Sequence, residues 1–188
     1  MNSIVCKVLI FSNLTDWKPW SPRSRTPVID GISAGLNEHG EESYIGRGPI
    51  MGWIIPGKIL LEGSAAFYVT GGPTEHVVTQ GVEYFSKDAT CNYKWVQSST
   101  GIVIPNAVKY RHKDMTFHIT RVQLVDSMQI GRINGDTKIM YYGYRGQALE
   151  ATEYEVLVCD KFYPVKNESQ AKEIQLTTRW KLLFPVET

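Results

Sequence analysis

The fold is decided by the stretch Tyr154-Glu155-Val156-Leu157-Val158-Cys159-Asp160 and by an earlier, partial copy of it. Tyr154, Val156 and Val158 occupy alternate positions, and a period of two over aromatic and β-branched residues is typical of a β-strand. The earlier copy is Glu83-Tyr84-Phe85-Ser86-Lys87-Asp88, which matches residues 155–160 at an offset of 72. We therefore predict one strand that occurs twice in the chain.

Two further matches extend this repeat toward the N-terminus. Trp20-Ser21-Pro22 aligns with Trp95-Val96-Gln97 at an offset of 75, and Pro56-Gly57-Lys58 aligns with Ile130-Gly131-Arg132 at an offset of 74. Because matches at a nearly constant spacing indicate an internal duplication, we predict four segments. These are an N-terminal strand in residues 1–16, a first repeat in residues 17–92, a second, diverged repeat in residues 93–160 and a C-terminal amphipathic strand in residues 161–188.

Strand patterns dominate the rest of the chain, and helical patterns are almost absent. Residues 65–69 and 139–144 are short aromatic or β-branched runs bounded by glycine. The 16 Gly and 9 Pro of the chain suit a protein with many turns. We predict an all-β fold of two tandem, pseudo-symmetric, antiparallel β-sandwich-like lobes, in which the terminal strands complete the sheets.

The C-terminal segment has the most regular alternation in the chain. One face carries Ile174, Leu176, Thr178, Trp180, Leu182 and Phe184. A strand with an apolar face needs a partner, because unpaired edges and exposed apolar faces promote aggregation. The apolar segment at residues 4–11 is one candidate partner. A second subunit is the other, which would make the protein a homodimer through its terminal strands.

Charge and hydropathy exclude several classes of function. The chain has 20 Lys plus Arg against 19 Asp plus Glu, a net charge of +1, so we expect no nucleic-acid partner. No run approaches the roughly 20 apolar residues of a transmembrane helix. The apolar run at residues 4–11 is interrupted by Lys7 and is too short for a signal peptide. We therefore expect a cytoplasmic protein, or one secreted without a clear signal peptide.

Residues with catalytic or metal-binding potential form no recognisable constellation. The chain has no phosphate-binding loop or dinucleotide-binding motif, so we expect neither an enzyme nor a cofactor. The three cysteines, Cys6, Cys91 and Cys159, are predicted to be packing thiols rather than a disulfide framework. We expect no metal site, because the histidines are scattered over His39, His76, His112 and His118. Trp17 and Trp20 fit a buried core better than a sugar-stacking platform.

Four spaced blocks in the first repeat resemble a known family. They are Ala34-Gly35-Leu36-Asn37, Gly40-Glu41-Glu42-Ser43-Tyr44-Ile45-Gly46-Arg47, Pro56-Gly57-Lys58 and Gly71-Gly72-Pro73-Thr74-Glu75-His76. Their order is similar to that of the DM-nine (DM9) repeat, a tandem β-repeat common in invertebrates, and residues 154–158 match the block that ends its pattern. The resemblance covers about residues 17–160 and implies paired β-sandwich-like lobes.

The resemblance also implies a ligand. Well-understood members of the family are mannose-binding lectins that help to detect microbes, and an acid in the first block and the lysine of Pro-Gly-Lys hold sugar hydroxyls. Here the acid position carries Asn37 and the lysine is Lys58, while Glu75 and His76 are retained. The second repeat carries Lys113 and Arg132 at the two positions, which departs from the family's pattern. We expect mannose-type binding at the first repeat, weakened by the neutral Asn37.

Three functions follow, and the first is the leading one. It is a non-enzymatic, mannose-type lectin-like protein with a role in innate-immune recognition. The first alternative is a protein-interaction or oligomerisation module that has lost sugar binding. The second is an accessory domain related to pore-forming toxins, which the neighbours of this repeat in related proteins imply.

Overall fold

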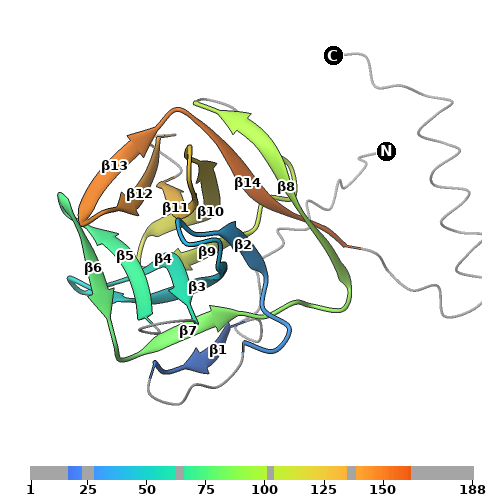
Figure 1. Ribbon diagram of the computed structural model, residues 1–188. Helices are drawn as coiled ribbons and strands as arrows, with labels where there is room; N and C mark the ends of the chain where they lie inside the picture. The colour runs from blue at the N-terminus through green and yellow to red at the C-terminus, as the bar shows by residue number, and fades with distance from the viewer. Residues whose placement is uncertain (1–16, 23–27, 62–65, 101–103, 135–138, 162–188) are drawn as a thin grey trace, which may run out of the picture.

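The protein is a β-structure in two halves that follow the predicted repeats (Figure 1). The computed structural model describes residues 17–22, 28–61, 66–100, 104–134 and 139–161. The first half contains β1 (Trp17–Trp20), β2 (Ser33–Leu36), β3 (Glu42–Ile50), β4 (Trp53–Leu60), β5 (Ala66–Gly71), β6 (Thr74–Val78) and β7 (Val82–Phe85). The second contains β8 (Cys91–Ser99), β9 (Lys109–His112), β10 (Met115–Gln123), β11 (Met128–Asn134), β12 (Met140–Tyr144), β13 (Gln147–Ala151) and β14 (Glu153–Lys161).

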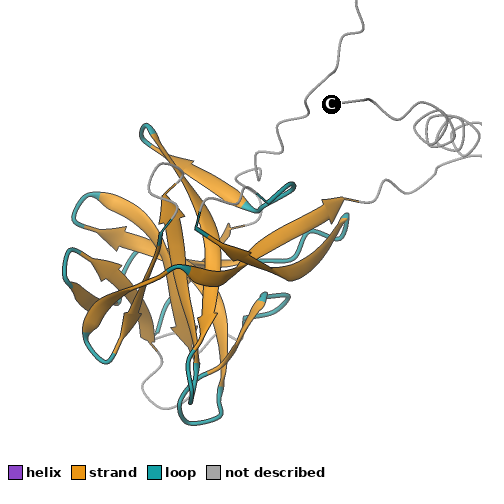
Figure 2. Ribbon diagram, turned by 90° about the horizontal axis from the view of Figure 1, so that it is seen from above, coloured by secondary structure: helices purple, strands orange, loops and turns teal. Residues whose placement is uncertain are grey.

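The secondary structure confirms the predicted all-β class. The described residues contain strands and loops only, as Figure 2 shows from above. All strand pairs for which a register is given are antiparallel, and short turns join most neighbours in the chain. The terminal strands expected in residues 4–11 and 174–184 lie outside the described residues.

The strand order demonstrates the duplication. Along the sheet it is β1-β7-β3-β4-β5-β6-β13-β12-β11-β10-β14-β8, with β2 on β3 and β9 on β10. If each strand is exchanged for its counterpart in the other repeat, the order is the same from the opposite end. The two lobes are therefore pseudo-symmetric, as predicted. They meet where β6 and β13 pair through Thr74 and Gln147, at the left of Figure 1.

Strand register corrects one part of the sequence alignment. Arg47 pairs with Glu83 at 2.7 Å and stacks 4.4 Å from the Trp17 ring. Its counterpart Arg121 pairs with Glu155 at 2.6 Å and stacks 4.4 Å from the Trp95 ring. The structural equivalent of Trp95 is thus Trp17 and not Trp20. The alignment on Trp20 was wrong because it matched two tryptophans without knowledge of how their strands pair with β7 and β14.

The hydrophobic core joins the two lobes. Its central cluster takes Trp17 and Ile45 from the first repeat and Ile119 and Leu157 from the second. Each lobe adds a cluster of its own, one containing Trp20 and the other Tyr154. Trp17 and Trp20 are both 6% exposed, which confirms their predicted place in the core.

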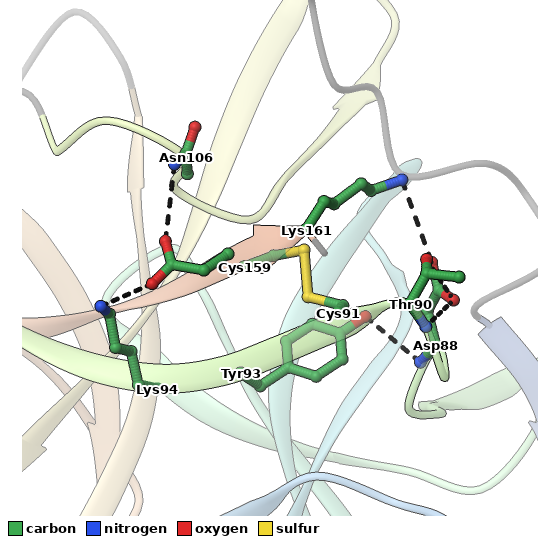
Figure 3. Close-up of a disulfide and its surroundings, with 9 residues drawn as sticks. Asp88, Thr90, Cys91, Tyr93, Lys94, Asn106, Cys159 and Lys161 are labelled. Carbon is green, nitrogen blue, oxygen red and sulfur yellow. Dashed lines mark hydrogen bonds and ion pairs between the residues drawn. A yellow bond between two sulfur atoms is a disulfide. The ribbon is translucent and has the colours of Figure 1, made fainter. Parts of the chain in front are cut away.

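A disulfide links Cys91 and Cys159, so the prediction of packing thiols was wrong for these two residues (Figure 3). Cys91 begins β8 and Cys159 is near the end of β14, and these strands pair directly, with a Cα–Cα distance of 5.5 Å between the cysteines. The pairing was not visible in the sequence because 68 residues separate them. Closing a loop of that length stabilises the fold by about 4 kcal/mol through loss of unfolded-state entropy. Cys6 lies outside the described residues.

Candidate functional site

The candidate site lies where the two repeats meet, and its central group is the Lys58 ammonium. Lys58 is on β4 and is only 5% exposed. Its Nζ donates a hydrogen bond of 2.5 Å to Gln129 Oε1 on β11 and lies 3.8 Å from Glu75 Oε1 on β6. The site therefore combines an ammonium, a carboxylate and an amide from three strands, with Gln129 contributed by the second repeat.

Glu75 is positioned by two glycines of the second repeat, Gly146 and Gly143. Its Oε2 accepts a hydrogen bond from Gly146 N at 3.1 Å, and Glu75 N donates to Gly146 O. The side chain lies directly against Gly143 on β12, where an added Cβ would be 2.6 Å from Glu75 Oε1. A glycine at position 143 is therefore required to seat Glu75 beside Lys58.

Burial determines the electrostatics of Lys58. Loss of hydration lowers the pKa of its ammonium, and the nearby carboxylates of Glu75 and, to a lesser extent, Glu38 oppose this shift. A desolvated cation interacts more strongly with polar ligands than a hydrated one does. The site is therefore suited to hydrogen-bonding a polar ligand that replaces water.

A chain of hydrogen bonds connects Lys58 with the surface. Gln129 is fully buried, and its Nε2 donates to Ser127 Oγ at 2.8 Å. Ser127 Oγ in turn donates to Asp126 Oδ1 at 3.0 Å. Sequence reasoning missed Gln129, Ser127 and Asp126, because the family's blocks lie in the first repeat and these residues come from the second.

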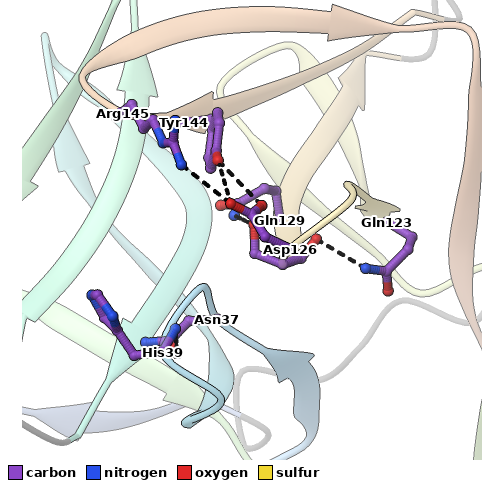
Figure 4. A network of polar contacts seen from close by, with 8 residues as sticks. Asn37, His39, Gln123, Asp126, Gln129, Tyr144 and Arg145 are labelled. Carbon is purple, nitrogen blue, oxygen red and sulfur yellow. Dashed lines mark hydrogen bonds and ion pairs between the residues drawn. The ribbon is translucent and has the colours of Figure 1, made fainter.

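An exposed polar cluster forms the rim of the site (Figure 4). The Tyr144 hydroxyl donates to Asp126 Oδ2 at 3.0 Å, and Arg145 Nη2 lies 3.2 Å from the same oxygen. Hydrogen bonds from Tyr144 and Ser127 lower the pKa of the Asp126 carboxyl. Asp126, Tyr144 and Arg145 thus hold the β10–β11 and β12–β13 turns together beside the buried ammonium.

Asn37 closes a turn in this structure. It is 1% exposed, and its Oδ1 accepts from His39 N and Glu41 N, both at 2.9 Å. Its Nδ2 donates to Glu41 Oε2 at 2.8 Å. Both lone pairs of Oδ1 are used, so Asn37 orders the β2–β3 turn. A carboxylate beside the Lys58 ammonium comes instead from Glu75, 3.8 Å from Nζ.

His76 belongs to the opposite face of β6 from Glu75, because successive residues of a strand point to opposite sides. Its Nε2 lies 2.8 Å from Thr74 Oγ1 on the exposed surface. The structure therefore brings Lys58 and Glu75 together and places His76 elsewhere.

The two candidate residues of the second repeat are arranged differently. Arg132 on β11 donates from Nη1 to Thr70 Oγ1 at 2.5 Å and to Thr70 O at 3.4 Å. Lys113 is exposed in the β9–β10 turn, and its Nζ lies 4.4 Å from the centre of the Trp53 ring. Neither residue is joined to a buried carboxylate in the described part of the chain.

The part of the chain that the structure describes holds no group of three or more His, Cys, Asp or Glu side chains that could bind a metal ion. It also contains no helix long and apolar enough to cross a membrane.

Comparisons with known proteins agree with the repeat architecture. The family model described as "DM9 repeat" matches residues 37–151, which is more than half of the 188 residues. No curated protein matches the chain. A solved structure with a similar fold is the crystal structure of the nematode sperm cell motility protein MFP2B, with a TM-score of 0.54 and 15% identity. The match covers 81% of this chain and 46% of that one, and at this identity it shows a shared fold alone.

Proposed function

The chain belongs to the DM9 repeat family, and from this we propose that it is a non-enzymatic protein that binds mannose-type carbohydrates. The observation that carries the proposal is the set formed by Lys58, Glu75 and Gln129 at the seam of the two repeats. We extend the proposal to the detection of microbial glycans, which the family resemblance supports.

The chemistry of the three groups suits a sugar. Each hydroxyl of a sugar both donates and accepts hydrogen bonds, whereas an ammonium only donates and a carboxylate only accepts. An amide such as that of Gln129 does both. Hydrogen bonds to charged groups contribute about 1.5–3 kcal/mol each, roughly twice as much as neutral ones. Lys58 and Glu75 together therefore supply the donor and acceptor that adjacent hydroxyls require.

Limited access predicts weak binding. The side chains of Lys58 and Glu75 are 7% and 8% exposed, so a ligand reaches only their edges. A ligand hydroxyl that bonds to Lys58 competes with the bond that the ammonium already makes to Gln129. Loss of the existing bond to Gln129 partly offsets the free energy gained from the new bond to the ligand, which favours a low affinity.

The disulfide bears on where the protein acts. Cytosolic reductants keep most thiols reduced, and disulfides persist mainly in oxidising compartments. The Cys91–Cys159 bond therefore supports the secreted alternative over the cytoplasmic one.

A protein-interaction module is the second candidate function. Met51 and Val125 occupy equivalent hairpin tips, β3–β4 and β10–β11, and are 66% and 107% exposed. Two exposed apolar tips at symmetry-related places favour contacts with another protein. The tail strand that first suggested this function lies outside the described residues.

Titration with methyl mannoside, monitored by calorimetry, tests the lectin proposal. Lys58→Met should weaken binding at least tenfold, because it removes a charged donor worth about 1.5–3 kcal/mol. Lys94→Met is the matched control, because it also removes a lysine charge. Lys94 lies on β8, where it forms a solvent-exposed ion pair with Asp160 and is not one of the groups of the Lys58 site. Circular dichroism must show that both variants fold. Equal affinities for the two variants, or no binding by the native protein, would remove support from the lectin and favour the interaction module.

A further inference from the structure

Arg132 is unusual among the arginines of the described residues because it lacks a carboxylate partner. Four others form ion pairs within 4.0 Å, namely Arg47–Glu83, Arg111–Asp114, Arg121–Glu155 and Arg145–Asp126. Arg132 is half-buried, and its Nη1 atom contacts the hydroxyl and carbonyl oxygens of Thr70. Its guanidinium has five N–H donors, so most of its donor capacity is not used by Thr70.

The duplication explains the missing partner. Arg132 is the counterpart of Lys58, since each follows a Gly on the equivalent strands β11 and β4. The counterpart of Glu75 is Ala148, because Glu75 N donates to Gly146 O and Ala148 N donates to Pro73 O in the same pseudo-symmetric pattern. The second copy has kept the cation and lost the acid that neutralises it in the first.

Arg132 consequently has no carboxylate within ion-pair distance among the described residues, and the ring of Tyr141, with its centre 5.9 Å from the guanidinium carbon, carries no formal charge. Burial lowers the pKa of its guanidinium, and the groups that oppose this shift are the phenols of Tyr110 and Tyr141 rather than a carboxylate. An arginine stays protonated in proteins in spite of such shifts. A partly buried cation without a counter-charge costs free energy, and a bound anion removes that cost.

The rim around Arg132 carries fewer side chains than the rim around Lys58. The residues equivalent to Asp126, Tyr144 and Arg145 are Gly52, Gly71 and Gly72. Cβ atoms added at Gly52 and Gly72 would each have only one side-chain contact within 4 Å, at 3.9 Å, and the contact of Gly52 is with Lys113 Nζ. The register of β9 with β10 makes His112 the counterpart of Asn37, so the alignment of Lys113 with Asn37 was wrong by one residue. Lys113 follows His112 in the β9–β10 turn and adds a second cation beside Gly52.

We propose that the Arg132 site, defined by Arg132, Thr70, Ala148 and the rim residues Gly52, Gly72 and Lys113, binds an oxyanion. The ligand class is a carboxylate, sulfate or phosphate group, carried by an acidic sugar or present as the free ion. The planar guanidinium fork matches two oxygens of such a group, which a single ammonium cannot do. The site is independent of mannose binding at Lys58.

The test is a titration of the full chain with sodium glucuronate, sulfate and inorganic phosphate, against sodium chloride at equal ionic strength. Affinity is measured by calorimetry and by the rise in melting temperature on binding. Arg132→Gln should weaken anion binding at least tenfold, because it removes the charge-assisted bonds. The double variant Thr70→Gly/Ala148→Glu should do the same, because it restores both the acid that the first repeat has at Glu75 and the glycine that seats this acid at position 143. Lys94→Met is the control and should bind as the native chain does.

Each outcome decides one point. Preference for glucuronate over sulfate and phosphate assigns the site to an acidic sugar, and equal response to all three assigns it to free oxyanions. If Arg132→Gln does not fold, the double variant decides, since it keeps Arg132 itself, and Thr70→Gly alone is its control. The proposal is overturned if none of the three anions acts differently from chloride, or if Thr70→Gly/Ala148→Glu binds them as tightly as the native protein.

Discussion

Replacing Gly143 with alanine tests whether Glu75 is seated as described. The new methyl carbon would lie 2.6 Å from Glu75 Oε1 and 2.8 Å from its Cγ and Cδ, so the side chain must move. Glu75 then loses the bond from Gly146 N at 3.1 Å and its approach to Lys58 at 3.8 Å. The backbone itself accepts a side chain here, because the equivalent position on β5 carries Thr70.

The magnitude follows from these contacts. The hydrogen bond to the charged carboxylate is worth about 1.5–3 kcal/mol, and alanine in place of a strand glycine returns about 0.5–1 kcal/mol. We expect a net loss of about 1–2 kcal/mol, which for a chain of this length lowers the melting temperature by roughly 2–8 °C. Mannoside binding should weaken in parallel, because Lys58 loses its acidic neighbour.

A double-mutant cycle isolates the clash. In a Glu75→Ala background the space beside Gly143 is empty, so Gly143→Ala should cost nothing or stabilise the strand slightly. The coupling free energy between the two sites, obtained from urea unfolding, should be about 1–3 kcal/mol. An identical loss of stability from Gly143→Ala in both backgrounds would show that Glu75 does not occupy the space over Gly143.

Three further predictions concern other parts of the chain. Cys91→Ser should lower the free energy of unfolding by about 4 kcal/mol through loss of the 68-residue loop closure, and urea titration of the native protein with and without reductant should show the same difference. Burial, with a smaller contribution from Lys109, lowers the pKa of His118 below its ordinary 6.5. As the pH falls, His118 is therefore protonated in the unfolded chain before it is protonated in the folded chain. The free energy of unfolding should be highest above pH 6.5, decrease as the pH drops through 6.5 and stop decreasing below the pKa of the folded state. His118→Gln should flatten this part of the profile, and an unchanged profile would assign the dependence to another group. Asn37→Asp should destabilise the protein by about 1 kcal/mol, because it removes the bond to Glu41 Oε2 and places two carboxylates together; a higher melting temperature, measured at low salt, would contradict the turn-forming role.

The overall architecture was predictable because it depends on patterns within single segments. The period of two at residues 154–158 indicates a strand regardless of what the strand packs against, and the repeated offset reveals the duplication. Trp17 was misaligned because insertions between the blocks shift the register, and only the Arg47–Glu83 pair identifies its counterpart.

The candidate site was predictable only for the residues of one repeat. Lys58 and Glu75 stand in family blocks, so the sequence pointed to both. Gln129 has no such block, and its counterpart in the first repeat is the apolar Ile55. Its importance depends on the packing of β4 against β11, which local sequence patterns do not encode. The disulfide was missed for the same reason, because it also depends on the pairing of segments far apart in the chain.

The side-chain bonds across the seam have an evolutionary consequence. Lys58 donates to Gln129, Arg132 to Thr70 and Tyr110 to the carbonyl of Ile54, and each bond runs from one repeat to the other. In an ancestor with a single repeat, the same contacts would have formed an isologous interface between two identical copies. In a single chain that contains both repeats, the two halves need not be identical. One copy can then keep its acid at position 75 while the other carries Ala148, so a single polypeptide has two chemically unlike surfaces at the seam, which no symmetric dimer could have.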